Sequence, residues 1–142
     1  MTQTFDLTPG AVLTGGSRTV TDAEIALLPA IMGAISPLFH DEERAKTTPM
    51  GSRILYGPAV LGIGIALTEH LLRDRVVALL EIMSVRFRRP VRVGDTLTAS
   101  LRVNDLQPRE GRAGLLLTTG DEVHNQAGEL IMTFSRKIVV RH

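Results

Sequence analysis

The sequence predicts an α+β fold in which an antiparallel sheet wraps around one central apolar helix. Two observations support this prediction. A long apolar stretch of helical length follows Gly57 and Pro58, and the second half of the chain changes to the alternating pattern of strands. The chain has 142 residues, the common length of one domain, so residues 1–142 are expected to form a single domain.

The first half of the chain predicts helices joined by an irregular connection. Residues 11–19 contain two glycines among small residues, which favours an extended lead-in. Thr21 and Glu24 have the spacing of a capping box, so a helix is expected from Asp22 to about Met32. Residues 33–57 then form a long connection, with a short exposed helix at the polar residues 40–46.

The central helix is expected from about Pro58 to Arg73, because proline suits a first helical turn. Its apolar residues fall on every side, which predicts that it is enclosed on nearly all sides. Segments of alternating apolar and polar residues, separated by turn residues, predict four consecutive strands. They are expected at residues 80–88, 97–103, 114–124 and 130–135.

The composition argues against several classes of function. A formal net charge of +1 gives no global attraction to nucleic acid or to a membrane. The lack of cysteine excludes disulfides, thiolate metal sites and a cysteine nucleophile. No metal-ligand spacing or glycine-rich phosphate loop is present, so neither a metal nor a cofactor is expected. With one Tyr, four Phe and no Trp, the chain offers few surfaces on which bases could stack.

The sequence predicts a cytoplasmic location. Residues 1–7 have neither the basic nor the apolar region of a leader. The longest apolar stretch, about residues 54–67, is shorter than the roughly 20 residues that a membrane span needs. No membrane partner is therefore expected.

Several segments resemble the MaoC-like dehydratases, the family that includes the R-specific enoyl-CoA hydratases. Residues 85–97, VRFRRPVRVGDTL, are similar to that family's strand, proline and Gly-Asp-Thr-Leu turn. Residues 125–129 are similar to its last hairpin turn, and residues 51–57 to the loop that enters its central helix, with Tyr56 where a histidine is usual. The resemblance implies a hot-dog fold.

Residues 33–41, GAISPLFHD, resemble the hydratase motif Gly-Asp-x-Asn-Pro-x-His-x-Asp. Ala34 and Phe39 stand at the positions of the catalytic Asp and His, and Ser36 stands at that of the Asn. In the family, the Asp and His position a water, move its proton and add it across the double bond of an enoyl thioester. Alanine and phenylalanine can do neither, because this work needs groups that titrate.

The candidate catalytic residues are His40, Tyr56 and Ser36. A small shift of the loop would let His40 replace the missing base; the alternative is a solvated residue at the start of the acidic helix. Tyr56 is a candidate donor to a carbonyl or, alternatively, half-buried packing.

The candidate substrate-binding residues are Gly57, Arg53, Phe39 and Asp41. Gly57 would present its amide at the start of the helix to a polarised thioester carbonyl, or it serves only the geometry of the turn. Arg53 is a donor or a surface charge, and Asp41 is a site residue or a helix cap. Four arginines, at positions 86, 88, 89 and 92, would suit the phosphates of a CoA-type carrier or form a solvated face.

The favoured function is that of a MaoC-like lyase with a non-standard active site, acting on an acyl thioester, most simply one linked to CoA, or on a related small carbonyl compound. One alternative is a catalytically silent hot-dog subunit that binds an acyl group or completes a partner's pocket. Another is an acyl-CoA thioesterase, which would need a carboxylate such as Asp41 or Glu42 to face the pocket. The resemblance implies a homodimer, or a heteromer with an active MaoC-like subunit.

Overall fold

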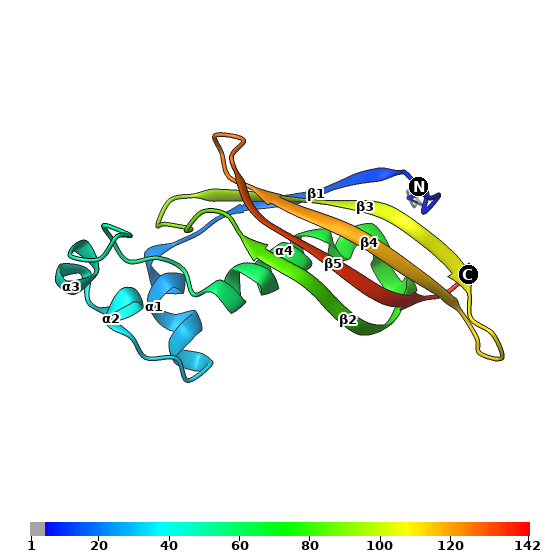
Figure 1. The fold of residues 1–142 in the computed structure, drawn as a ribbon, viewed down its shortest axis with the longest axis horizontal. Helices are drawn as coiled ribbons and strands as arrows, with labels where there is room; N and C mark the ends of the chain where they lie inside the picture. The colour runs from blue at the N-terminus through cyan, green and yellow to red at the C-terminus, as the bar shows by residue number, and fades with distance from the viewer. Residues whose placement is uncertain (1–4) are drawn as a thin grey trace.

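The computed structural model describes residues 5–142. Residues 1–4, part of the N-terminal stretch considered above, lie outside that range. One five-stranded antiparallel sheet has the order β1-β3-β4-β5-β2. Its strands are β1 (Val12–Thr19), β2 (Val76–Phe87), β3 (Thr96–Pro108), β4 (Leu115–His124) and β5 (Leu130–Val140). The sheet curves around helix α4 (Gly57–Leu72), which confirms the predicted arrangement (Figure 1).

The predicted number of strands was too small by one, because the lead-in is strand β1 and pairs with β3. Its two glycines interrupt the alternating pattern, and the register of pairing shifts between Thr14 and Ser17. A β-carbon at Gly15 would overlap the carbonyl oxygen of Leu67 on α4. Glycine therefore lets the helix lie directly against this strand.

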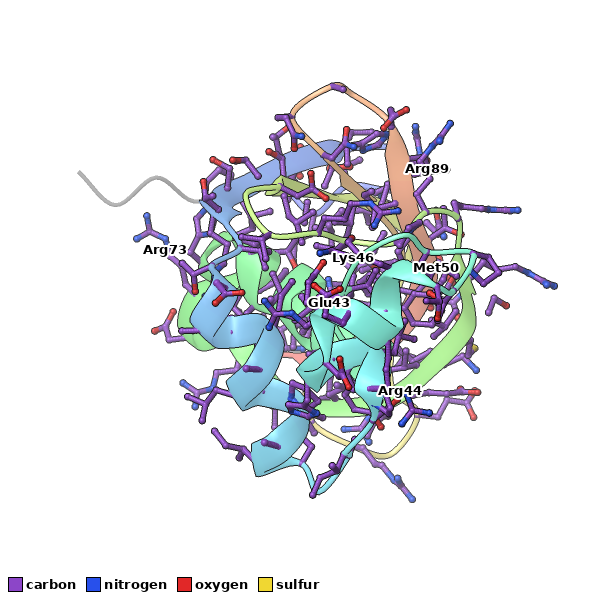
Figure 2. All side chains as sticks on the ribbon, turned by 90° about the vertical axis from the view of Figure 1, so that its left-hand side faces the viewer. Glu43, Arg44, Lys46, Met50, Arg73 and Arg89 are labelled. Atoms are coloured by element: carbon purple, nitrogen blue, oxygen red, sulfur yellow. The ribbon has the colours of Figure 1, made fainter. Side chains whose placement is uncertain are left out.

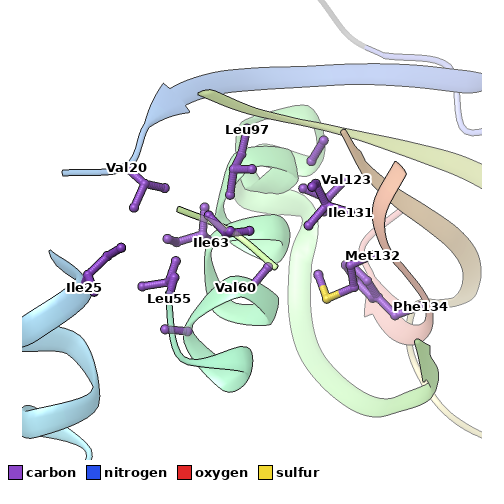
Figure 3. Close-up of a cluster of buried hydrophobic side chains, with 13 residues drawn as sticks. Val20, Ile25, Leu55, Val60, Ile63, Leu97, Val123, Ile131, Met132 and Phe134 are labelled. Carbon is purple, nitrogen blue, oxygen red and sulfur yellow. The ribbon is translucent and has the colours of Figure 1, made fainter. Parts of the chain in front are cut away.

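Helix α4 starts and ends one residue before the predicted bounds, and it packs its apolar side on the sheet. Val60 and Ile63 are buried among side chains from several strands (Figure 3). At Gly64 the helix approaches the sheet closely, since a β-carbon there would lie 2.8 Å from a methyl group of Val123. In residues 5–142, no helix combines the length and the apolar content needed to cross a membrane.

The prediction that this helix is enclosed on nearly all sides was wrong. A stripe along its outer side, comprising Pro58, Gly62, Ala66 and Glu69, is exposed. Glycine and alanine count as apolar in a sequence pattern, but they contribute little side-chain area to a core. The pattern therefore overestimated how much of the helix surface is covered.

Three short helices project from the end of the sheet at which α4 begins (Figure 1). They are α1 (Asp22–Ile31), α2 (Pro37–His40) and α3 (Glu42–Lys46). The predicted capping box starts α1: the Thr21 amide donates to Glu24 at 2.8 Å, and the Thr21 hydroxyl accepts from the Glu24 amide at 3.3 Å. Helix α1 ends one residue before the predicted Met32, and Gly33 follows with a φ of 81°.

A buried polar network joins α4 to the middle of the sheet. The guanidinium of Arg136, on β5, donates to both carboxylate oxygens of Asp121 on β4 and, at 3.0 Å, to the hydroxyl of Thr68 on α4. The hydroxyl of Thr119 donates to Asp121 at 2.5 Å. Burial raises the pKa of Asp121, and its hydrogen bonds with Arg136 and Thr119 oppose this rise.

Replacing Asp121 with alanine should destabilise the protein by about 3–5 kcal/mol, because the buried charge of Arg136 would lose its partner. Denaturant unfolding at one fixed protein concentration measures this loss. The exposed neighbour Glu122 provides the control, and Glu122→Ala should change the stability by less than about 1 kcal/mol. A loss below about 1 kcal/mol for Asp121→Ala would show that α4 does not depend on the network.

Candidate active site at the start of helix α4

A groove of about 260 Å³ opens where α4 begins. Apolar side chains from the connection before α4, from α4 itself and from the end of β2 form most of its wall. They are Met50, Ile54, Leu55, Val60 and Phe87, with Pro90 and Val91 beyond β2. Two exposed arginines, Arg88 and Arg89, also line it. The groove combines an apolar wall with cationic groups, as sites for amphiphilic small molecules do.

Gly57 lines this groove, and its backbone amide is free. The amides of Ala59 and Val60 donate to the Tyr56 carbonyl at 2.9 and 3.1 Å, and Pro58 has no N–H. Within residues 5–142, the Gly57 amide donates to no other group. The first turn of α4 therefore offers a single donor, reinforced by the helix dipole, to an acceptor oxygen.

The ring of Phe87 limits the space above Gly57. A β-carbon at position 57 would lie 3.3 Å from the tip of that ring. Phe87 as a residue is 52% exposed. An alanine would push the ring outward and narrow the path to the amide. The absence of a side chain at Gly57 therefore leaves room for the Phe87 ring.

Phe39 and Tyr56 pack against each other beside the groove. Their rings meet edge to face with centroids 5.3 Å apart, and Phe39 is only 9% exposed. The position of the motif's histidine therefore lies next to the residue that precedes α4, but it carries an apolar ring. Ala34, at the position of the motif's aspartate, is half-buried.

His40 connects α1 to α2. Its Nε2 lies 2.9 Å from the Ala26 carbonyl oxygen, and its Nδ1 lies 3.1 Å from that of Ser36. The Ser36 amide also donates to Nδ1 at 3.4 Å, so both ring nitrogens of His40 have backbone partners. A role for His40 as a base would require one ring nitrogen to exchange its backbone contact for a water.

Ser36 and Asp41 cap the two short helices. The Ser36 hydroxyl accepts from the Leu38 amide at 3.2 Å, and a carboxylate oxygen of Asp41 accepts from the Arg44 amide at 3.0 Å. Each cap satisfies an amide that has no partner within its own helix.

Arg53 joins α1 and α3 to the segment that enters α4. Its guanidinium donates to Glu42 at 2.8 Å and to Asp22 at 2.5 Å, and its side chain is 19% exposed. The hydrogen bond from Arg53 lowers the pKa of Glu42, and both carboxylates raise the pKa of Arg53. The guanidinium is therefore already paired with two carboxylates.

Of the seven predicted site residues, Gly57 is the one found in the lining of the groove. Phe39 and Tyr56 lie beside it, while His40, Ser36, Asp41 and Arg53 make contacts that hold α1, α2 and α3 together. The sequence did not single out Phe87 or Met50 as site residues. Phe87 was inside a recognised motif, but alternation does not say which face of an edge strand covers a groove.

The fold and the groove define a class of protein: a sheet wrapped around one helix, whose first turn lines a groove. A family model described as a MaoC-like domain matches residues 5–126. The chain belongs to this family, and its fold is the hot-dog fold expected from the resemblance.

Two curated relatives and two solved structures illustrate the similarity. A 3-hydroxybutyryl-CoA dehydratase of Methylorubrum extorquens is 31% identical over 75% of this chain and 68% of its own length. An (R)-specific enoyl-CoA hydratase of Rhodospirillum rubrum is 30% identical over 66% and 65%. A protein from Archaeoglobus described as a monoamine oxidase regulatory protein has a TM-score of 0.85 and 33% identity over 95% and 92% of the chains. The (R)-hydratase of A. caviae involved in PHA biosynthesis has a TM-score of 0.77 and 26% identity over 97% and 98%.

Proposed function

We propose that this chain is a MaoC-like hydratase/dehydratase that acts on an acyl-CoA thioester and binds the thioester carbonyl at the Gly57 amide. The free amide in an apolar groove is the observation that carries the proposal. The names of the two curated relatives, a dehydratase and a hydratase of CoA thioesters, support the choice of substrate. A cytoplasmic location and the single-domain organisation of residues 1–142 stay predictions from the sequence.

The chemistry follows from where charge develops. When the oxygen of water bonds to the β-carbon of an enoyl thioester, a base takes one proton from that water, negative charge moves onto the carbonyl oxygen, and a proton then adds to the α-carbon. An N–H already aimed at that oxygen stabilises the charge without reorganisation. This part of the mechanism needs only the backbone of Gly57. The transfer of the proton needs a side chain, for which His40 and Tyr56 are the candidates, with Ser36 beside His40.

The purified protein should hydrate crotonyl-CoA, with loss of the absorbance of the conjugated enoyl thioester. Gly57→Ala should lower kcat/KM about tenfold or more, because the new methyl group crowds the donor that stabilises the transition state. Gly62→Ala, at an open position on the outer side of the same helix, is the control and should leave the rate unchanged. Equal rates for Gly57→Ala and the wild type would refute the assigned carbonyl site.

If the protein hydrates crotonyl-CoA, His40→Ala should abolish the activity, because the imidazole is the proposed replacement base. Thermal unfolding must show in parallel that the His40→Ala variant is folded, since His40 also connects α1 to α2. A folded variant with an unchanged rate would eliminate His40 as the base and leave Tyr56.

A catalytically silent subunit is the second candidate function. Ala34 and Phe39 replace both acid-base groups of the family motif, and both nitrogens of His40 contact backbone carbonyls. Such a subunit would bind acyl thioesters without converting them.

A parallel assay for free thiol on saturated acyl-CoAs tests the thioesterase alternative, although Asp41 already caps α3 and Glu42 already binds Arg53.

We also propose that two copies associate through strand β2. It lies at the edge of the sheet and pairs only with β5, so its other edge is open among the described residues. Edge strands that expose apolar side chains are surfaces for pairing. Five large apolar residues of β2 are exposed: Val77, Leu79, Leu80, Ile82 and Phe87.

Light scattering should therefore give the mass of two chains for the wild type. Leu80→Lys should shift the mass toward one chain, because it places like charges on both sides of the pairing edge. Leu27→Lys is a matched control, since Leu27 and Leu80 are both 56% exposed and Leu27 lies on α1. A wild type with the mass of one chain would contradict the proposed dimer.

A further inference from the structure

A second hollow shares lining residues with the groove at the start of α4. It measures about 290 Å³ and is lined by the turn after β2 and by the β4–β5 hairpin. Arg89 and Pro90 line both cavities, so the two meet at this pair. Met50, in the wall of the groove, and Arg89 lie on the same side of the molecule (Figure 2). A ligand longer than the groove could therefore extend past Arg89.

The backbone holds the two arginines firmly at this junction. The amides of Arg88 and Arg89 both donate to the Ile131 carbonyl, at 2.7 and 3.4 Å. Pro90 follows and restricts the chain further. The start of each side chain is thus fixed, although its end is exposed.

Arg88 carries the uncompensated charge at the junction, whereas Arg89 forms an ion pair with Glu129, which lines the adjoining hollow together with Asp95. Within residues 5–142, the Arg88 side chain makes no hydrogen bond or ion pair. Arg89 lies 3.5 Å from Glu129, whose carboxylate also accepts from Asn125 at 2.9 Å, and the Arg89 side chain is 56% exposed. By contrast, Arg53 and Arg136 contact carboxylates at hydrogen-bond distance. Arg88 is therefore available to an anion, and the exposed Arg89 can exchange its contact with Glu129 for one.

We propose that Arg88 and Arg89 bind the phosphates of the thioester's carrier and that the adjoining hollow receives the end of that carrier. This inference rests on the proposed function, because the carbonyl at Gly57 sets where the rest of the molecule leaves the groove. Guanidinium groups match the geometry of phosphate oxygens and form charge-assisted hydrogen bonds with them. The shared chemistry is a phosphate ester on a pantetheine arm, supplied either by CoA or by a carrier protein.

Calorimetric titration with saturated thioesters tests this binding without turnover, because butyryl groups have no double bond to hydrate. The ligands are butyryl-CoA, butyryl-4′-phosphopantetheine and butyryl-pantetheine. Arg88→Gln and Arg89→Gln should each weaken the binding of butyryl-CoA about tenfold or more, and should change that of butyryl-pantetheine less than about twofold. Dependence on the arginines with butyryl-4′-phosphopantetheine assigns the contact to the phosphate common to CoA and carrier proteins, and dependence with CoA alone assigns it to the nucleotide.

Arg86→Gln is the matched control, since Arg86 is exposed at the end of β2, just before Arg88 and Arg89, and is absent from the lining of both cavities. It should leave all three affinities unchanged. Equal losses for butyryl-CoA and butyryl-pantetheine, or no loss for either, would overturn the inference, as would a loss of the same size in Arg86→Gln. A wild type that binds neither butyryl-CoA nor butyryl-pantetheine would instead refute the proposed function. A wild type that binds these two thioesters equally well would refute only the phosphate contact.

Discussion

The close approach of helix α4 to the sheet is the constraint on which the rest of the structure depends. Glycines make it possible on two sides: Gly15 on β1 faces the helix backbone, and Gly64 on the helix faces Val123. The hydrogen bond from Arg136 to Thr68 then connects the helix to β5 below it. With its axis fixed in this way, the first turn of α4 can open only at the end of the sheet, toward Phe87 and the connection before the helix.

The position of α4 determines which chemical groups line the groove. The Gly-Pro pair at residues 57 and 58 leaves one N–H free, because proline removes a donor and the Tyr56 carbonyl accepts from the next two amides. The three short helices contribute through contacts rather than through side chains that point into the groove. Arg53, for example, joins Asp22 and Glu42 just before the chain enters α4. The shape of the groove therefore depends on these contacts more than on the individual side chains of the motif.

The fold could be predicted well because its main pattern is local. A long apolar helix and four alternating strands follow from periodicity, whereas β1 was missed because Gly15 and Gly16 remove the pattern that marks a strand. The exposed stripe of α4 was also missed because of small residues, since glycine and alanine count as apolar in a sequence pattern whether they are buried or exposed. Of the candidate site, the free amide of Gly57 could be predicted because it depends only on the immediate neighbours of that residue. The contacts of His40 could not, because Ala26 is 14 residues away and only the packing of α1 on α2 brings them together.

The substitutions in the family motif separate two tasks that a hydratase normally combines. Phe39 keeps the packing of its position, since its ring meets Tyr56 edge to face, but it removes a group that could titrate. Ala34 removes the second such group. The amide of Gly57 belongs to the backbone and survives both changes. Polarising a carbonyl therefore remains possible on this scaffold, whereas moving a proton has to be taken over by another side chain or by another subunit.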